Sequence, residues 1–333
     1  MILVTGGTGL VGAHLLYHLL LENDKVKAIH RKNSDLQSVK MVFSYYSEDF
    51  ETIFKRIEWV EADICDVYLL EKAFINVTEV YHAAALISFD PKDYKLLRKV
   101  NIEGTSNIVN LCIDQKIKKL CFVSSIATIE KAVNKTTINE DEDWNLENNN
   151  YGYAITKYGA EMEVWRASQE GVEVVIVNPG IILGAGFWKK GPGELFTKIN
   201  KGLKFYSEGI TGYIAVTDVV NIMIQLMKSS LKNERYILVS ENRSFKEVFF
   251  QIADNLDKKR PSILVTPFMS EIGWRLLKVV SIFTRRPPLL TSHSAKSIQN
   301  TYFYSSAKIK KALNYEFEPI NQTIQKVCFL YKK

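Results

Sequence analysis

TGGTGLVG, residues 5–12, lies between the short apolar run Ile2–Val4 and a helix-like stretch of leucines that extends to Asn23. Three of its four glycines recur at every third position: Gly6, Gly9 and Gly12. A tight turn needs residues without a Cβ, and so does a backbone that approaches a pyrophosphate. The helix N-terminus then offers free N–H groups and a partial positive charge to phosphate. The stretch therefore predicts a dinucleotide-binding turn between a first strand and a first helix.

Strand-like and helix-like stretches alternate after this turn. The further strand candidates are 25–30, 57–63, 79–84, 118–125 and 172–179. Such alternation indicates βαβ crossovers, so we predict an α/β fold with a doubly wound parallel sheet of the Rossmann type. The regular alternation of strand-like and helix-like stretches ends after Pro179-Gly180. We therefore expect a dinucleotide-binding domain over 1–178 and a smaller α+β substrate-binding region, 179–333, packed on it.

Bulk composition narrows the class of protein. The chain has 333 residues, 47% hydrophobic and 24% charged, as in soluble globular proteins. Its net charge of +6 is spread along the chain, which argues against a nucleic-acid surface. We expect a cytoplasmic protein with reduced cysteines, no bound metal, no signal peptide and no transmembrane segment. Its cysteines are Cys65, Cys112, Cys121 and Cys328.

The end of the second strand bears on the choice of dinucleotide. A carboxylate there would bind a ribose 2′-hydroxyl, whereas an arginine suits a 2′-phosphate. The strand ends in His30-Arg31-Lys32, so NADP(H) is favoured over NAD(H), with Arg31 on the phosphate. The alternative interpretation is a solvated basic loop. Asp63-Ile64, after the third strand, is placed to border the adenine ring.

YGYAITKYGAE, 151–161, sets Lys157 four residues after Tyr153, so both face the same side of a helix. A free tyrosine has a pKa near ~10 and needs a neighbouring cation to work as an acid or base at neutral pH. By itself the spacing could equally describe two surface residues. Ser124 and Ser125 end the fifth strand, at the sheet edge where ligands bind in this architecture. Together these residues predict a proton relay to a carbonyl or alcohol oxygen.

Seven motifs occur in an order that resembles the extended short-chain dehydrogenase/reductase family: TGGTGLVG, YHAAA, NIEGT, VSS, YAITK, NPG and YIAVTDVV. The chain looks most like the branch of dihydroflavonol reductases and 3β-hydroxysteroid dehydrogenases. The later stretches RRPPLLTSHSAKSI and YFYSSAKIKKALNYEFEP are similar to bacterial members of that branch.

The resemblance assigns roles to individual residues. It implies that Tyr153 is the acid/base, that Lys157 lowers its pKa and holds a ribose, and that Ser125 binds the substrate oxygen. It also implies that Asn101 ties elements together, that Asp218 caps a helix, and that Tyr151 and Tyr158 are packing or rim residues. The expected cofactor-binding residues are Gly6, Thr8, Gly9, Leu10, Val11, Arg31, Asp63, Ile64, Ala83, Ala84, Tyr153, Lys157, Pro179 and Gly180.

These roles point to an oxidoreductase that interconverts a ketone and a secondary alcohol. Dehydratases of the family carry an Asp-Glu pair where this chain has Ile126-Ala127, which argues against dehydration. A nucleotide-sugar 4-epimerase with tightly bound NAD is the alternative, weakened because Thr211-Gly212 stands where such members carry an arginine before a tyrosine. A non-catalytic NADP-sensing protein is a third interpretation, which the intact Ser/Tyr/Lys set opposes.

Two features of the later part of the chain are each compatible with more than one interpretation of what the protein binds. Aromatic and leucine side chains in the later loops suit either a hydrophobic small-molecule substrate or simple packing: Phe187, Trp188, Leu195, Phe196, Phe205 and Tyr206. The basic amphipathic stretch 271–286 suits packing or peripheral membrane contact, and we favour packing. Its apolar stripe is Ile272, Leu276, Val279, Val280 and Phe283. The resemblance further suggests a homodimer through helices 92–116 and 151–170.

Overall fold

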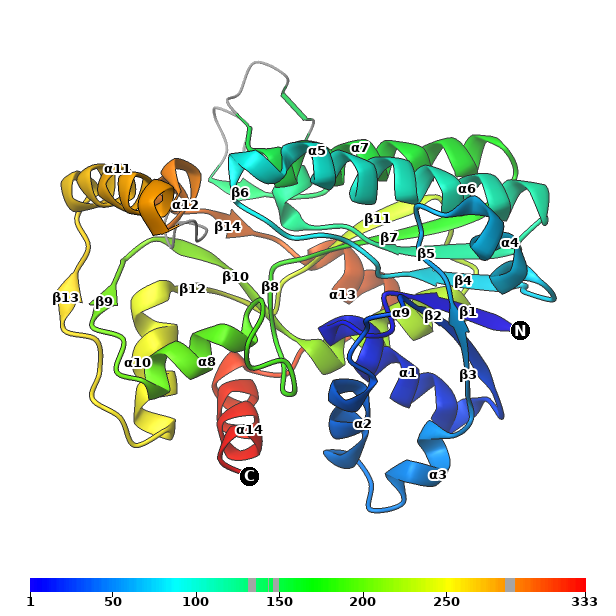
Figure 1. Ribbon diagram of the computed structural model, residues 1–333, viewed down its shortest axis with the longest axis horizontal. Helices are drawn as coiled ribbons and strands as arrows, with labels where there is room; N and C mark the ends of the chain where they lie inside the picture. The colour runs from blue at the N-terminus through cyan, green and yellow to red at the C-terminus, as the bar shows by residue number, and fades with distance from the viewer. Residues whose placement is uncertain (131–135, 143, 146–149, 285–290) are drawn as a thin grey trace.

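A seven-stranded parallel sheet forms the centre of the structure (Figure 1). This computed structural model describes residues 1–130, 136–142, 144–145, 150–284 and 291–333, with only the helix backbone for 278–284 and 292–294. In spatial order the strands are β3 (Ile57–Glu61), β2 (Val26–His30), β1 (Ile2–Thr5), β4 (Glu79–His82), β5 (Lys119–Val123), β7 (Glu173–Pro179) and β11 (Glu234–Leu238). All neighbours pair in parallel, which confirms the predicted Rossmann-type sheet.

The chain order reverses between β1 and β4, and the glycine turn follows β1 at that reversal. Crevices outside the carboxyl ends of strands form at such switch points, where open α/β sheets bind ligands. Both faces of the sheet are covered by helices (Figure 1). One face carries α1 (Leu10–Glu22), α2 (Leu36–Ser44), α3 (Phe50–Phe54), α9 (Val216–Lys228) and α13 (Ala307–Leu313). The other carries α4 (Val67–Phe74), α5 (Tyr94–Leu97), α6 (Gly104–Asp114) and α7 (Gly152–Gln169).

Short helical turns connect several of these elements. They are η1 (Pro91–Asp93), the π-helical segment η2 (Arg98–Glu103) and η3 (Ile126–Thr128). The strands read as nearly continuous apolar runs because helices cover both of their faces. Leu120, Cys121 and Phe122 of β5, for example, are fully buried.

A second sheet and its helices form a separate apolar core built from the later part of the chain. The sheet contains β8 (Ile181–Leu183), β10 (Ile210–Ala215) and β12 (Glu241–Ser244), and the helices are α8 (Gly193–Asn200), α10 (Phe245–Asn255) and α14 (Ile320–Lys332). Two strand pairs, β9 (Phe205–Tyr206) with β13 (Ile263–Leu264) and β6 (Thr137–Ile138) with β14 (Phe303–Tyr304), and helices α11 (Pro267–Thr284) and α12 (Ser292–Ser297) complete the chain.

The later part of the chain also completes the main sheet, since β11 forms its edge strand and α9 packs on its face. The two parts therefore interlock, and a division into domains 1–178 and 179–333 stays a proposal.

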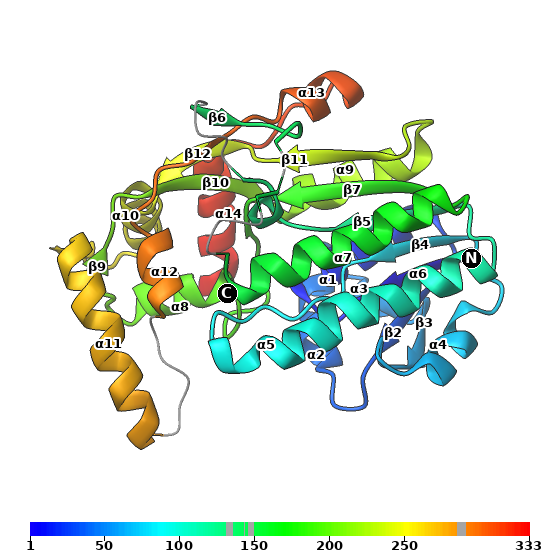
Figure 2. The ribbon, with the colours of Figure 1, turned by 90° about the horizontal axis from the view of Figure 1, so that it is seen from above.

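Helix α11 lies at the periphery of the molecule (Figure 2). Ile272 is 43% exposed and Leu276 is 61% exposed, so the predicted packing is not seen for these two side chains. The side chains of Val279, Val280 and Phe283, and the basic residues 285–286, lie outside the described residues. Among the helices that the structure describes, none is both long and apolar enough to cross a bilayer.

Candidate active site

The glycine turn brings β1, α1 and the end of β4 into close contact. Gly6 has a φ of +70°, and a Cβ on it would lie 2.6 Å from the carbonyl carbon of Ala83. The Gly9 amide donates to the Gly6 carbonyl oxygen at 2.9 Å, and Gly9 is the N-cap of α1. Thr8, Leu10 and Val11 complete the loop and the first turn, whose amides have no earlier carbonyl within the helix.

A series of buried, hydrogen-bonded side chains lies next to this loop. The Thr5 hydroxyl lies 2.6 Å from Nδ1 of His82, whose Nε2 lies 2.9 Å from the Thr105 hydroxyl. Burial lowers the pKa of His82 to about 3, so this histidine stays neutral. The Ala84 amide donates to the same Thr5 hydroxyl at 3.3 Å. Ala83 and Ala84 are thus held beside the glycine loop, as a residue pair along a bound dinucleotide must be.

A cavity of about 470 Å³ opens at the carboxyl ends of β2 and β3. It is lined by Arg31, Lys32, Asn33, Glu61, Ala62, Asp63 and Leu69. Asp63 is fixed there because its carboxylate accepts from the Cys65 amide at 2.9 Å. Ile64 is buried against Gly104, on the helix side of the same loop. The glycine loop and this cavity lie at the same sheet edge, so the residues present fit an adenosine and its adjoining phosphates.

Ser125, Tyr153 and Lys157 come together at this edge of the sheet. Ser125 follows β5 and begins η3, where its hydroxyl accepts from the Ala127 amide at 3.1 Å. Tyr153 and Lys157 lie one turn apart near the start of α7, and the Tyr153 hydroxyl is close enough to Ser125 for this neighbour to lower its pKa. Lys157 is 2% exposed and donates to the Val123 carbonyl at 2.8 Å. Ser125 and Tyr153 are therefore neighbours, and Lys157 is held by the strand that leads to Ser125.

Burial has the largest effect on the pKa values of Tyr153 and Lys157. It raises the pKa of Tyr153 to about 12, while the neighbouring Ser125 hydroxyl acts in the opposite direction and lowers it. The net direction is upward, opposite to the lowering that the sequence predicts. Burial also lowers the pKa of Lys157 to about 7, and the charge of Glu161 raises it. Tyr153 is consequently protonated at neutral pH, which is the state that a proton donor requires.

Pro179 and Gly180 end β7 beside these residues in the sheet order. The Gly180 amide donates to the Leu238 carbonyl at 3.0 Å, and a Cβ on Gly180 would lie 2.4 Å from the Gly212 carbonyl oxygen. This close approach between Gly180 and Gly212 fixes how the chain passes from the main sheet into the second sheet. Both residues thus lie at the carboxyl edge of the sheet, where a nicotinamide ring is expected.

Asn101 ties three segments together, as predicted. Its side chain accepts from the Leu86 amide at 2.8 Å, and donates to the Leu86 carbonyl at 3.0 Å and the Thr156 hydroxyl at 3.1 Å. It lies in the π-helical segment η2, and such π-turns are frequent at functional sites. Asn101 therefore fixes the loop after β4 against the helix that bears Tyr153.

The aromatic residues beside Tyr153 are not those that the sequence suggests. Phe89 stacks on Tyr151 at 5.7 Å between ring centres and lies 6.1 Å from the ring of Tyr153. Phe89 is 46% exposed and so can contact a ligand. In contrast, Phe196 is fully buried in the second core, and Trp188 packs on it.

Most other aromatics of the later loops also pack within the protein. Phe187 and Leu195 lie against the two cores, and Tyr206 contacts Phe250, whereas Phe205 is half-exposed. Tyr158 stacks on Trp144, in agreement with its predicted packing role. Packing is thus the better interpretation of the later loops, and the candidate substrate wall is the segment after β4.

Asp218 differs from its predicted role. Ala215 is the N-cap of α9, and Asp218 lies in the first turn instead. Its carboxylate accepts from the Tyr315 hydroxyl at 2.8 Å and from the Glu318 amide at 3.0 Å. Asp218 therefore anchors the C-terminal segment to α9 rather than capping the helix.

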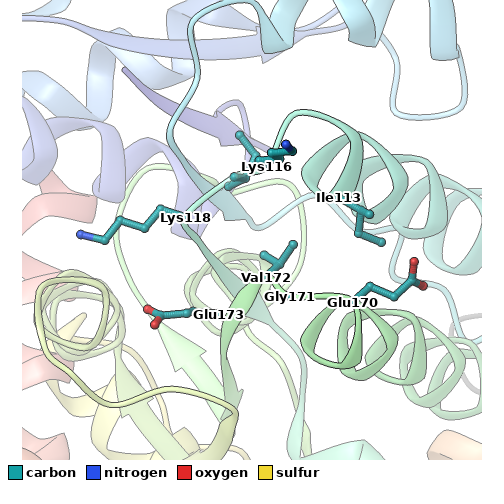
Figure 3. A pocket seen from close by; sticks show the side chains of 8 residues that line it. Ile113, Lys116, Lys118, Glu170, Gly171, Val172 and Glu173 are labelled. Carbon is teal, nitrogen blue, oxygen red and sulfur yellow. The ribbon is translucent and has the colours of Figure 1, made fainter.

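A second hollow of about 320 Å³ lies at the opposite, amino edge of the sheet (Figure 3). Its charged lining includes Lys116, Lys118, Glu170 and Glu173, next to the C-terminal ends of α6 and α7. Ser125 and Pro179 follow the other ends of the same strands, β5 and β7. The hollow is thus remote from the candidate active site.

The model of an NAD-binding family, described as Male sterility protein, matches residues 4–246. The chain belongs to this family. It is accordingly a member of the extended short-chain dehydrogenase/reductases, with its relatives in the dihydroflavonol-reductase and 3β-hydroxysteroid-dehydrogenase branch. This confirms the resemblance seen in the motifs.

Curated relatives match nearly the whole chain. It is 28% identical over 315 residues to a putative dihydroflavonol 4-reductase of Synechocystis sp., covering 92% of this chain and 88% of that protein. It is 25% identical over 320 residues to sterol demethylase protein B of Methylococcus capsulatus, covering 93% and 92%. These relatives support an enzyme that uses a nicotinamide cofactor.

Solved structures share the fold. UDP-glucose 4-epimerase of Thermotoga maritima superimposes with a TM-score of 0.78 at 18% identity, covering 99% of this chain and 98% of that one. A dTDP-glucose 4,6-dehydratase of Streptomyces venezuelae gives 0.77 at 16% identity, covering 99% and 96%. At such identities the likeness shows the architecture alone.

Sequence patterns alone do not single out the side chains that surround Ser125, Tyr153 and Lys157. Glu161, Thr128, Asn178 and Arg235 form a buried hydrogen-bonded group beside Ser125 and Lys157. One signal was available for the first of them, because Glu161 follows Lys157 by four residues and so shares its helix face.

Proposed function

We propose that the protein is an NADP(H)-dependent reductase or dehydrogenase that interconverts a ketone and a secondary alcohol on a hydrophobic small molecule. The proximity of Ser125 to Tyr153, with the buried Lys157 one turn along α7, is the observation that carries this proposal. A carbonyl oxygen bound by both hydroxyl groups would be polarised by Ser125 and would receive its proton from Tyr153.

The cofactor is held by the glycine loop, the Ala83-Ala84 segment and the basic cavity. The nicotinamide supplies or accepts the hydride at the substrate carbon. Lys157 holds a ribose hydroxyl and provides positive charge next to Tyr153, which favours the phenolate that remains after proton transfer. Pro179 and Gly180 border the ring, and the exposed face of Phe89 offers an apolar contact to the substrate.

The preference for NADP(H) rests on the lining of the cavity at β2 and β3. Arg31 and Lys32 offer two cations to a 2′-phosphate, and the guanidinium of Arg31 can bind a phosphate with two parallel hydrogen bonds. The same cavity contains Glu61, whose carboxylate suits a ribose 2′-hydroxyl. This residue is the specific observation that favours the alternative, an epimerase with tightly bound NAD.

Thermal stability against titrated NADPH and NADH separates these two proposals. A ligand at one hundred times its Kd stabilises a protein by about 2.7 kcal/mol. We expect NADPH to stabilise the protein more than NADH, and the difference to disappear in Arg31→Ala. Lys25→Ala is the matched control, because Lys25 is an exposed cation at the opposite end of the same strand.

NADPH oxidation with a panel of hydrophobic ketones then tests the reaction. Steady consumption of NADPH supports a reductase. Co-purified NAD, no response to added NADPH and no net turnover would reject the proposal and favour the epimerase.

A further inference from the structure

Two buried charged side chains and a partly buried third lie behind Ser125 and Tyr153. Lys157 and Glu161 project from α7, and Arg235 projects from β11. Lys157 is 2% exposed and Glu161 is fully buried, with its carboxylate 3.3 Å from the guanidinium of the partly buried Arg235. Buried charges are expensive unless they are paired and hydrogen-bonded, and replacing such groups with apolar ones is often neutral for stability. The presence of this group therefore points to a role beyond stability.

The Glu161 carboxylate holds the turn that presents Ser125. Its Oε2 accepts from the Ser124 hydroxyl at 2.6 Å, the Thr128 hydroxyl at 2.9 Å and the Asn178 amide at 3.0 Å. The Asn178 amide also donates to the backbone carbonyl of Ser125 at 3.2 Å, and the single proton of the Thr128 hydroxyl is shared between Glu161 and this carbonyl, which lies 2.9 Å away. Removing the acceptor would therefore loosen the groups that fix Ser125 from both sides of η3.

The same carboxylate faces Lys157 along the helix. The Lys157 ammonium donates to the Val123 carbonyl and lies 4.2 Å from the centre of the Phe122 ring. The titratable or charged groups around it are Tyr153 and Glu161 on α7, His82 on β4 and Arg235 on β11. His82 is neutral, so among these described groups Glu161 alone supplies a negative charge to offset the burial of the lysine.

Arg235 pairs with the Glu161 carboxylate, but Lys157, Glu161 and Arg235 together still carry a net charge. Its guanidinium also donates to the carbonyl oxygens of Glu140 and Glu142, at 2.6 to 3.0 Å. With Lys157 and Arg235 cationic and Glu161 anionic, the group retains one excess positive charge beside Tyr153. A phenolate on Tyr153 would neutralise it.

We propose that Glu161, held by Arg235, is a positioning residue that fixes the Ser125 turn and keeps Lys157 cationic. The part concerning Lys157 rests on the proposed function, whereas the contacts to the Ser125 turn are independent of it. Glu161 does not touch the substrate in this arrangement and acts through its neighbours.

The first test compares Glu161→Gln with Glu161→Asp in the ketone reduction. The glutamine keeps the shape but removes the charge, so Lys157 loses its proton at a lower pH. If its pKa falls from about 7 by about one unit, kcat/KM should fall about twofold near pH 6 and about tenfold near pH 8. Glu161→Asp retains the charge and should lower kcat/KM by a similar factor at both pH values.

Glu163→Gln is the matched control, because Glu163 lies on the same helix but pairs with Arg166. It should leave the pH profile unchanged. If Glu161→Gln lowers kcat/KM by the same factor near pH 6 and near pH 8, the charge part of the proposal is overturned. Such a uniform loss is what a merely structural role of Glu161 predicts.

NADPH affinity provides a readout that does not require the reaction. The cofactor is anionic, so loss of the Lys157 charge should weaken its binding. Between about pH 6 and pH 8, the Kd of Glu161→Gln should rise up to about fivefold more than that of the wild type, given the same one-unit fall in the pKa of Lys157. If the wild type reduces no ketone, the proposed function fails while this titration still tests Glu161. If the Kd of NADPH changes with pH in the same way in Glu161→Gln and in the wild type, the inference is overturned.

Glu161→Gln leaves Arg235 unpaired in the interior and could fail to fold for that reason alone. The double variant Glu161→Gln/Arg235→Met removes both members of the pair. It should fold and still show a downward shift of the alkaline limb of the pH profile, smaller than that of Glu161→Gln because a nearby cation is lost as well. A folded double variant with the wild-type pH profile would reject the role of Glu161.

Discussion

The carbonyl oxygen of Gly6 lies directly against Gly12, so closely that a Cβ on Gly12 would be 2.1 Å from it. Gly6 itself has a positive φ, which L-residues rarely adopt. The two glycines therefore set how the first turn of α1 meets the end of β1. A pyrophosphate could not reach the amides of this turn if the loop were displaced by a side chain.

Gly12→Ala should disrupt the loop itself. The added methyl group would meet backbone atoms, which cannot move aside as a flexible side chain can. We expect a loss of stability of about 1–3 kcal/mol together with loss of cofactor binding, as for overpacking of a close contact. Urea denaturation and NADPH titration would measure the two effects.

Gly9→Ala is the matched comparison. Its Cβ would lie 3.4 Å from the Gly6 carbonyl oxygen, at the edge of ordinary van der Waals contact. We expect near-normal stability but weaker NADPH binding, because the methyl group would occupy the side from which phosphate approaches. Equal loss of stability in both variants would contradict this account of the turn.

The six strands predicted from apolar runs all form, because most of these runs are buried between helices and can be recognised without knowing their neighbours, whereas the edge strand β3 is only partly buried. Strand β11 was not foreseen as part of the main sheet. Its residues, Glu234–Leu238, alternate polar and apolar only weakly, and their place beside β7 is set by the return of the chain after α9. Edge strands of this kind depend on tertiary contacts that local patterns do not contain.

The candidate trio Ser125, Tyr153 and Lys157 could be proposed from the sequence because its chemistry is distinctive and two of its members share a local spacing. Arg235 could not, since it meets Glu161 across 74 positions of sequence. Phe89 was missed for a similar reason: its contact with Tyr151 depends on how Asn101 fixes the loop after β4. Sequence patterns are therefore enough to propose reacting groups, and the fold is needed to find the side chains around them.

Tyr153→Phe should abolish most of the reaction while leaving the fold intact. The variant loses only a hydroxyl whose partner, Ser125, still caps η3 through the Ala127 amide. Removal of a general acid typically lowers rates by about 10²–10⁴-fold. Ketone reduction should therefore drop by that order, with NADPH affinity and urea stability close to wild type. Full activity in the variant would reject the proton-donor role and favour the non-catalytic interpretation.

Phe89→Ala should weaken substrate binding more than the chemical step. The ring is 46% exposed and stacks on Tyr151 beside Tyr153, so its loss removes apolar surface from the proposed substrate wall. We expect KM for a hydrophobic ketone to rise about tenfold, the equivalent of about 1.4 kcal/mol, with kcat little changed. Phe329→Ala, at an exposed position on α14, is the control and should leave both constants unaltered.

The stability of the protein should depend on pH through Asp218. Burial raises its pKa from 3.8 to about 6, so the folded state binds this proton more tightly than the unfolded state does. Its contribution is fully present below about pH 4 and is lost as the pH rises to about 6. Between pH 4 and pH 6 the free energy of unfolding should fall by about 2 kcal/mol from this group alone, out of about 3 kcal/mol over its whole titration.

Asp218→Asn should remove that slope while keeping an acceptor for Tyr315 or the Glu318 amide. Urea denaturation of the wild type and the variant at pH 4, 5 and 6 would measure the difference between their free energies of unfolding. Asp254→Asn is the control: Asp254 pairs with Arg260, which lowers its pKa, so its own pH dependence lies below this window. A difference between the wild type and Asp218→Asn that stays constant from pH 4 to 6 would show that the carboxylate is ionised throughout and that its two donors outweigh its burial.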